Sequence, residues 1–329
     1  MQMLIHYMES SLILKNNKII IITGPTGVGK TSISVNIAQY MPEIEIISAD
    51  SMQIYNNLNI GTDKPNHDIL SKYVHHCIDL VEPTEIFNVM RYSHYAMQCI
   101  KNIYKNNKKP LIVGGSGLYI KSIIDPIFEG PGSNAIIRSK LTLLARNKGN
   151  EYLYNELRKK DAEYAKKISI NDTKRIIRAL EVFYLTGKTL SDFHKKNILD
   201  PQKSKYNFYI ICIYMNRKKL YTKINQRVDR MIDEGLIEET SALIDKYGDE
   251  KINAIQALGY RQAIKYIRGY ITKDEAIQMI KKETRNFAKR QLSWFKNQMP
   301  VNLWMNLDEF KNIEESVDTI IKIMKDNGY

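Results

Sequence analysis

The chain has 329 residues, of which 43% are hydrophobic and 26% charged, an ordinary globular mixture that excludes a disordered or low-complexity protein. Lys and Arg outnumber Asp and Glu by 49 to 36, and the net charge of +13 favours a polyanionic partner such as nucleic acid, although a coding bias toward lysine would leave the same basic surface. The three cysteines have no short paired spacing, which predicts neither a zinc site nor a disulfide framework and favours a reducing, cytoplasmic environment.

The predicted elements alternate between strands and helices. The apolar stretch Lys18–Thr23 predicts a buried strand, followed by a glycine-rich loop and a helix from about Lys30 to Tyr40. A helix is also predicted over Asn88–Asn106. Further strands are predicted at Ile44–Asp50, His75–Leu80, Pro110–Gly115, Asn207–Met215 and Val301–Leu307. This order predicts an α/β fold with a P-loop NTPase-like core, in which helices flank a parallel sheet.

One long segment interrupts the alternation. Residues 125–202 are almost wholly helical and polar in pattern, between a glycine- and proline-rich entry and the exit "LDPQKS". We therefore expect an all-helical subdomain at 125–202, inserted between the first part of the core (1–124) and its completion with C-terminal basic helices (203–329). The longest apolar runs are too short to span a bilayer, and the first residues lack the order of a signal peptide. No membrane association is expected.

The stretch "GPTGVGKT" has the spacing of a phosphate-binding loop, Gly24-x-x-x-x-Gly29-Lys30-Thr31. It follows a predicted strand and opens a predicted helix, the context that makes this motif specific. Glycines let backbone N–H groups converge on phosphate oxygens, and the helix N-terminus adds the positive end of its dipole. Lys30 would reach the terminal phosphates, and the Thr31 hydroxyl would be a ligand of Mg²⁺.

The rest of an NTP-hydrolysing site is missing. A hydrolase normally needs an acidic residue at the end of another strand to organise Mg²⁺ and water. Asp50 is in such a place, but it begins "DSMQIY", which hydrolysis does not require. The strand "PLIVGGSG" ends in glycines and Ser116 rather than in an acid. The pattern therefore favours a phosphorylated substrate that is not hydrolysed for work.

Six motifs in order resemble the tRNA dimethylallyltransferases, also called tRNA isopentenyltransferases, from about Ile19 to Trp304. They are "GPTGVGKT", "ISADSMQIYNNLNIGTDKP", "GGSGLYIKSI", "RIIRALEVFYLTGK", "QALGYRQAI" and "AKRQLSWFK". The resemblance implies transfer of a dimethylallyl group from dimethylallyl diphosphate to N6 of adenosine 37, in the anticodon loop of tRNAs reading codons that start with U. Such an enzyme uses Mg²⁺, and we expect a monomer without an obligate protein partner.

The resemblance also implies a role for each motif. Asp50 matches the family's catalytic Asp, which would take the proton from the adenine amine, and Ser116 stands where the family commonly has Thr. The base would be flipped out of the loop to reach this centre. Whether the diphosphate leaves in a direct displacement or through an allyl cation stays open. The implied diphosphate ligands are Gly24, Thr26, Gly27, Val28, Gly29, Lys30, Thr31 and Arg217.

The implied tRNA-binding residues fall into three groups. Gln53 would offer a donor and an acceptor to a base edge, whereas Phe287 and Trp294, seven residues apart, are interpreted as core. Those at the reacting centre are Asp50, Ser51, Met52, Gln53 and Ser116. Those in the inserted helices are Arg138, Lys174, Arg175 and Arg178. Those near the C-terminal end are Gly259, Tyr260, Arg261, Arg285 and Lys289.

Three other functions remain compatible with parts of the pattern. An adenylate isopentenyltransferase of the cytokinin type shares this core but uses a free nucleotide, and the basic inserted helices disfavour it. A P-loop kinase would bind ATP and transfer its phosphoryl group. A non-catalytic RNA-binding module would use the basic helices alone. Products formed with AMP, with an anticodon stem-loop or with ATP distinguish these possibilities.

Overall fold

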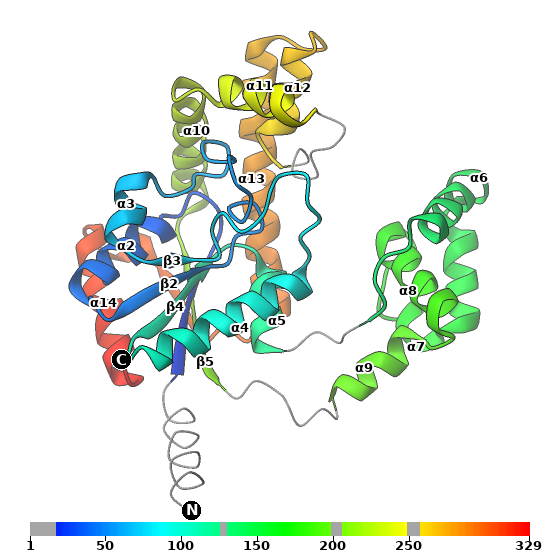
Figure 1. Ribbon diagram of the computed structural model, residues 1–329, viewed down its shortest axis with the longest axis horizontal. Coiled ribbons are helices and arrows are strands. Elements are labelled where there is room, and N and C mark those ends of the chain that lie inside the picture. The colour runs from blue at the N-terminus through cyan, green and yellow to red at the C-terminus, as the bar shows by residue number, and fades with distance from the viewer. Residues whose placement is uncertain (1–17, 126–129, 199–205, 249–256) are drawn as a thin grey trace, which may run out of the picture. The chain divides into compact units, whose positions relative to one another are not determined.

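The computed structural model describes residues 18–125, 130–198, 206–248 and 257–329. Its described strands form one parallel sheet in the order β3-β2-β4-β1-β5-β6 (Figure 1). They are β1 (Lys18–Thr23), β2 (Ile44–Ser48), β3 (His75–His76), β4 (Lys109–Gly114), β5 (Asn207–Tyr214) and β6 (Leu303–Asn306). This arrangement confirms the predicted α/β fold. The loop after the central strand β1 therefore lies at the edge where the carboxyl ends of the strands meet, the usual ligand-binding edge of such sheets.

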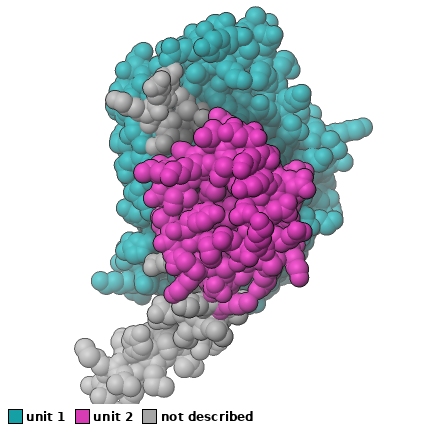
Figure 2. Space-filling view, turned by 90° about the vertical axis from the view of Figure 1, so that its right-hand side faces the viewer, with its two compact units in different colours: residues 1–125, 204–329 teal, residues 126–203 magenta. Residues whose placement is uncertain are grey.

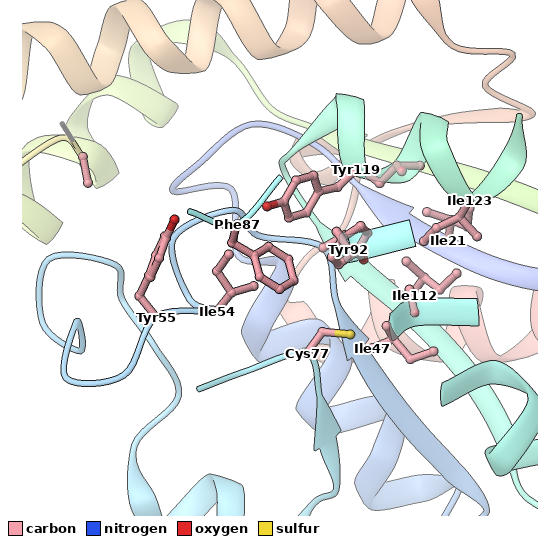
Figure 3. Close-up of a cluster of buried hydrophobic side chains, with 14 of the residues drawn as sticks. Ile21, Ile47, Ile54, Tyr55, Cys77, Phe87, Tyr92, Ile112, Tyr119 and Ile123 are labelled. Atoms are coloured by element: carbon pink, nitrogen blue, oxygen red, sulfur yellow. The ribbon is translucent and has the colours of Figure 1, made fainter. Parts of the chain in front are cut away.

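The central strand is buried on both faces because both faces of the sheet are covered. Ile19 and Ile21 belong to one hydrophobic core, and Ile20 and Ile22 belong to the other. Side chains alternate across a strand, so a run of four isoleucines fills both cores at once. Figure 3 shows part of the first core, where Tyr119 and the neighbouring Tyr92 stack with ring centroids 4.0 Å apart.

Different helices complete the two cores. The first core receives α4 (Val89–Lys105) and α5 (Gly117–Ile124), and the second receives α2 (Lys30–Tyr40) and α14 (Ile313–Asp326). The expected helices at 30–40 and 88–106 are thus confirmed. Shorter elements are α3 (His67–Lys72) and a 3₁₀ turn at Leu307–Glu309.

A group of helices from the last third of the chain extends beyond the sheet (Figure 1). They are α10 (Arg217–Asp233), α11 (Leu236–Tyr247), α12 (Tyr260–Ile267) and α13 (Lys273–Gln298). The long helices α10 and α13 pack against each other and both contribute to the second core. A segment far from the phosphate loop in sequence is thereby brought to it.

Two predicted strands end two or more residues earlier than expected. The strand expected at His75–Leu80 contains only His75 and His76, because Cys77 and Asp79 have left-handed backbone conformations with φ of 61° and 51°. Such residues cannot continue a strand. Strand β2 ends at Ser48, so Asp50 lies in the loop beyond it.

The chain divides into two compact units, residues 1–125 with 204–329 and residues 126–203 (Figure 2). The described elements of the second unit are the helices α6 (Ala135–Lys160), α7 (Ala162–Ala165), α8 (Thr173–Thr186) and α9 (Leu190–Ile198), which enclose a core of their own. Across the described part of the chain, no helix combines the length and apolar character that a bilayer crossing requires.

A buried carboxylate joins two helices of the second unit. Glu181 of α8 has no solvent exposure and accepts hydrogen bonds from both Arg138 of α6 and Arg178, one turn earlier in α8. The backbone N–H of Asn134 donates to the same group. Burial raises the pKa of Glu181, but the hydrogen bonds outweigh it and hold that pKa below its ordinary value.

Candidate active site

The phosphate loop has the shape its glycines predict. Gly24 and Gly27 have φ of 147° and 77°, and a Cβ on Gly24 would collide with the carbonyl oxygen of Ile213 in β5. Gly29 caps helix α2 at φ 106° without a side-chain hydrogen bond to the helix. The first N–H groups of α2 consequently have no side-chain cap and face the loop, which is the arrangement that binds phosphate at a helix N-terminus.

Lys30 is held inside this loop. Its Nζ donates to the carbonyl oxygens of Gly24 and Pro25 at 2.9 and 2.8 Å. Burial lowers the pKa of Lys30 to about 8, although the negative charge of Asp50 opposes that shift. The ammonium group is therefore pre-positioned in the loop, and an anion bound there would favour its protonated form.

Two helices hold Thr26 at the tip of the loop. From α10, Arg227 Nη1 donates to Thr26 Oγ1 at 2.8 Å. From α13, Gln291 Oε1 accepts from the backbone N–H of Thr26, also at 2.8 Å. Asp63 lies within 3.4 Å of Arg227 Nε and receives a hydrogen bond from Arg230. The loop is thus joined to a pair of arginines that share one carboxylate.

Asp50 follows β2 and faces the loop that follows β4. Its Oδ1 accepts from the N–H of Met52 at 2.9 Å, which fixes the orientation of the carboxylate. Ser116 Oγ accepts from the N–H of Ser51 at 3.0 Å. A Cβ on Gly114 would collide with the backbone of Ala49, so the glycine lets the two strand ends approach. The "GGSG" turn therefore places Ser116 beside the segment that carries Asp50.

Two cavities meet at Asp50. The phosphate-loop cavity, of about 530 Å³, is lined by Lys30, Thr31 and other residues of the loop and α10. The Ser116 cavity, of about 310 Å³, is lined by Ser51, Met52 and Ser116, with residues of α12 and α13. Both cavities share the same five residues, Thr26, Asp50, Thr62, Arg227 and Phe287. A ligand in each cavity would thus meet at the Asp50 carboxylate.

Arg217, the arginine expected at the diphosphate, lies elsewhere. It is the first residue of α10, is exposed, and places its guanidinium carbon 5.1 Å from the ring centre of Tyr221. Arg217 was expected at the diphosphate because it closely follows the predicted strand Asn207–Met215. Helix α10 instead approaches the loop in its middle, at Arg227, which lines both cavities.

Gln53 also differs from its expected role. Its Oε1 accepts from Ser48 Oγ, and its Nε2 lies 3.3 Å from the carbonyl oxygens of both Thr62 and Asp63. Both ends of the carboxamide are therefore occupied, one by Ser48 and the other by the loop at 62–63. It lines the phosphate-loop cavity, whereas Ser51 and Met52 line the Ser116 cavity. The structure does not support a contact between Gln53 and a base edge.

The residues expected near tRNA at the C-terminal end have different surroundings. Gly259 and Arg261 line the Ser116 cavity, and Arg261 forms an ion pair with Glu283. Tyr260 is buried, with its ring against Gly61 and its hydroxyl donating to Glu239. Its side chain therefore packs inside the protein, and its contact with tRNA stays a prediction.

Helix α13 carries residues whose importance the sequence did not reveal. Arg285 donates to Asn225 of α10, so it joins the two helices, while Lys289 is exposed. Phe287, interpreted as core, lines both cavities instead, and Arg290 lines the Ser116 cavity. Gln291 belongs to the quoted motif "AKRQLSWFK", but counting its basic residues draws attention away from it. The only sequence feature that points to Gln291 is its place in this family motif, because the residue carries no charge.

Comparison with known proteins identifies the family. The family model described as IPP transferase matches residues 53–298. The chain belongs to this family. It is 42% identical to the tRNA dimethylallyltransferase of Natranaerobius thermophilus, with 95% of this chain and 94% of that protein covered. It is 41% identical to the tRNA dimethylallyltransferase of Halothermothrix orenii, with 92% of each chain covered.

Solved structures of the IPP transferase family share the fold. The full-length tRNA isopentenylpyrophosphate transferase of Bacillus halodurans aligns with a TM-score of 0.66 and 35% identity, over 94% of this chain and 98% of that chain. A eukaryotic dimethylallyltransferase, described as acting on tRNA, aligns with a TM-score of 0.76 and 25% identity, over 94% of this chain and 79% of that chain. The match covers both compact units of this chain.

Proposed function

We propose that this chain transfers a dimethylallyl group from dimethylallyl diphosphate to N6 of adenosine 37, in the anticodon loop of tRNAs that read codons starting with U. The observation that carries the proposal is the position of Asp50, which lines both the phosphate-loop cavity and the Ser116 cavity. A diphosphate in the first cavity and a flipped base in the second would bring donor carbon and acceptor nitrogen together at this carboxylate. The names of the relatives support the same reaction.

The phosphate loop would bind the leaving group. Charge accumulates on the diphosphate as its C–O bond breaks, and preorganised donors near it lower the barrier. The Lys30 ammonium, the Arg227 guanidinium and the N-terminus of α2 supply those donors around one cavity. Arg227 replaces Arg217 in this proposal.

Asp50 would act on the acceptor. As the N6 nitrogen forms its bond to the allylic carbon, the electron pair of the C–O bond leaves with the diphosphate. The nitrogen then loses a proton, which the Asp50 carboxylate accepts. The hydrogen bond from Met52 N–H keeps one carboxylate oxygen in place during this transfer. Ser116 would hold the Ser51 backbone beside the base.

The residues at the loop fit a magnesium ion bound together with the diphosphate. Thr31, in the first turn of α2, lines the same cavity as Ser48 and Asp50. Among the described residues there is no group of three or more His, Cys, Asp or Glu side chains that could hold a metal by themselves. Magnesium is commonly bound by one or two protein oxygens and substrate phosphates, so Thr31 would hold it. When bound, it would neutralise part of the diphosphate charge.

Contacts to tRNA phosphates are proposed for the exposed cations. Lys174 and Arg175 are exposed on α8, and Lys289 and Arg290 are exposed on α13. Arg138 and Arg178 instead hold the buried Glu181, so we assign them to the stability of the helical unit. Neutralising a phosphate-binding cation should weaken tRNA affinity and reduce its salt dependence.

The test is transfer of labelled dimethylallyl from its diphosphate to total tRNA, to an anticodon stem-loop and to AMP. The proposal expects label in both RNAs, located on the N6-modified adenosine after nuclease digestion. Label appearing efficiently in AMP would favour the adenylate isopentenyltransferase instead. Phosphoryl transfer from ATP without any prenyl transfer would favour a kinase. Sedimentation and cell fractionation would test the expected monomer and its cytoplasmic location.

A further inference from the structure

Gln291 connects the phosphate loop, which would bind the leaving diphosphate, with the turn after β4, which lies beside the acceptor site. It lies on α13 with only 8% of its surface exposed. Its Oε1 accepts from the N–H of Thr26 in the phosphate loop at 2.8 Å. Its Nε2 donates to the carbonyl oxygen of Gly115, in the turn after β4, at 2.9 Å. One side chain therefore bridges the backbones that follow β1 and β4.

The bridge continues to Asp50. The residue after Gly115 is Ser116, whose hydroxyl accepts from the N–H of Ser51, next to Asp50. The turn is also closely packed on the carboxamide, because a Cβ on Gly115 would lie 2.5 Å from Gln291 Nε2. Thr26, Gln291, Gly115, Ser116 and Ser51 thus form one continuous series of contacts from the phosphate loop to the catalytic segment.

We propose that Gln291 is a positioning residue that sets the distance between the phosphate loop and Asp50. The inference rests on the proposed function, since it assumes a diphosphate on the loop and an acceptor at Asp50. A displacement of about 1 Å between reacting groups can cost about 100-fold in rate. Gln291 acts through Thr26 and Gly115 and need not contact either substrate itself.

The carboxamide is suited to this place because it donates and accepts at once. A Glu carboxylate can accept from Thr26 but cannot donate to Gly115, and a Met side chain of similar length can do neither. A neutral carboxylic acid, however, has one carbonyl oxygen and one O–H group, the same pattern as the carboxamide. The variant Gln291→Glu should therefore regain both hydrogen bonds when it is protonated.

The experiment compares the full-length variant with the wild type in dimethylallyl transfer to tRNA between pH 5.5 and 8. At pH 8 we expect kcat/KM for dimethylallyl diphosphate to be at least 30-fold below wild type in Gln291→Glu. A glutamate with an ordinary pKa is about 6% protonated at pH 5.5, so the ratio of variant to wild type should rise about 2- to 3-fold on acidification to that pH. The charged groups that share this cavity are present in both proteins, as is His75; they are Lys30, Asp50, Asp63, Lys223, Arg227 and Arg230. Their own titration is therefore largely removed by taking the ratio.

Three further measurements separate positioning from a general loss of structure. Gln291→Met should be equally impaired at pH 8 but should not recover in acid. Gln298→Glu, on the exposed end of the same helix, should remain within 2-fold of wild type at every pH. Affinity for tRNA, measured by filter binding, should change less than 2-fold in Gln291→Glu. If this variant does not fold, Gln291→Asn keeps the donor and acceptor one methylene shorter and should still lose at least 10-fold.

Two results would overturn the inference. One is full activity at pH 8 in Gln291→Met or in Gln291→Asn. The other is a loss that appears equally in tRNA affinity and melting temperature, which would indicate a structural role only. A wild-type protein that transfers no dimethylallyl group at all would instead refute the proposed function, and the inference with it.

Discussion

Replacing Arg227 by Ala tests the assignment of the diphosphate site most directly. The chain offers a matched control on the same helix, because Arg217 begins α10 and Arg227 lies ten residues further along it. The side chain of Arg227 is 19% exposed and donates to Thr26 in the phosphate loop. Arg217 is exposed and stacks on Tyr221. Both variants remove one positive charge, so a difference between them depends on position.

The expected magnitude follows from the contact that would be lost. A hydrogen bond between a guanidinium and a charged oxygen contributes about 1.5–3 kcal/mol, and each 1.4 kcal/mol corresponds to a factor of ten. Arg227→Ala should therefore lower kcat/KM for dimethylallyl diphosphate roughly 10- to 100-fold. An exposed arginine stacked on one ring contributes only about 0.5–1 kcal/mol to stability. Arg217→Ala should leave kcat/KM within about 2-fold of wild type, since it removes no contact at the cavity.

The assay is steady-state transfer to an anticodon stem-loop with the diphosphate varied at saturating RNA. Arg227→Lys would separate charge from geometry, because lysine keeps the charge but cannot hold Thr26 and a diphosphate in the same fork. A loss in Arg217→Ala as large as in Arg227→Ala would refute the assignment of the diphosphate to the α10 midpoint. So would an unchanged KM and kcat in Arg227→Ala.

Three further predictions concern the acceptor, the turn and the helical unit. Asp50→Asn should lose about 100-fold or more in kcat, as expected when a general base is removed, yet keep tRNA affinity in filter binding; weakened affinity would instead indicate a binding role. Gly117→Ala should lower the melting temperature, because its Cβ would collide with the Trp294 ring. In the control Gly132→Ala, the new Cβ would have no neighbouring atom within 4 Å, so the melting temperature should not change. Glu181→Gln should lower the free energy of unfolding by about 2–3 kcal/mol at pH 7 in denaturant titrations. Because the folded-state pKa of Glu181 is lowered, the carboxylate stabilises the fold fully only above its unfolded-state pKa of about 4.5. This stabilisation disappears as the pH falls through the folded-state pKa. A Glu181→Gln variant that is equally destabilised at pH 3 and pH 7 would contradict this.

Short-range sequence patterns predicted the strands and the loop whose formation depends on neighbouring residues. The isoleucine run of β1 and the glycines around Lys30 are short-range signals, and the structure has both in the predicted elements. Strand β2 also forms where it was expected, although it ends before Asp50. The strand at His75–Leu80 was predicted too long because Cys77 and Asp79 adopt left-handed conformations, which an apolar pattern does not reveal.

The partners of the phosphate loop could not be predicted in the same way. Thr26 contacts Gln291, 265 positions away in the chain, and Arg227, 201 positions away. A helix rotates its side chains by about 100° per residue, so choosing the arginine that faces the loop requires the start and the direction of α10. For the same reason Tyr260 and Gly259, adjacent in sequence, face the core and the cavity respectively.

The surroundings of the loop account for a phosphate loop that serves transfer rather than hydrolysis. In an NTPase, the group beyond the terminal phosphate is a water molecule held by an acidic or amide side chain. Here Asp50, which lines the phosphate-loop cavity, also lines a second cavity, and the turn after β4 brings Ser116 rather than an acid. That second cavity contains Met52, Val228 and Met231, which favour a base or an apolar group over water. On the proposed function, the same loop would hold a leaving group, and a nucleobase in the adjoining cavity would supply the attacking atom.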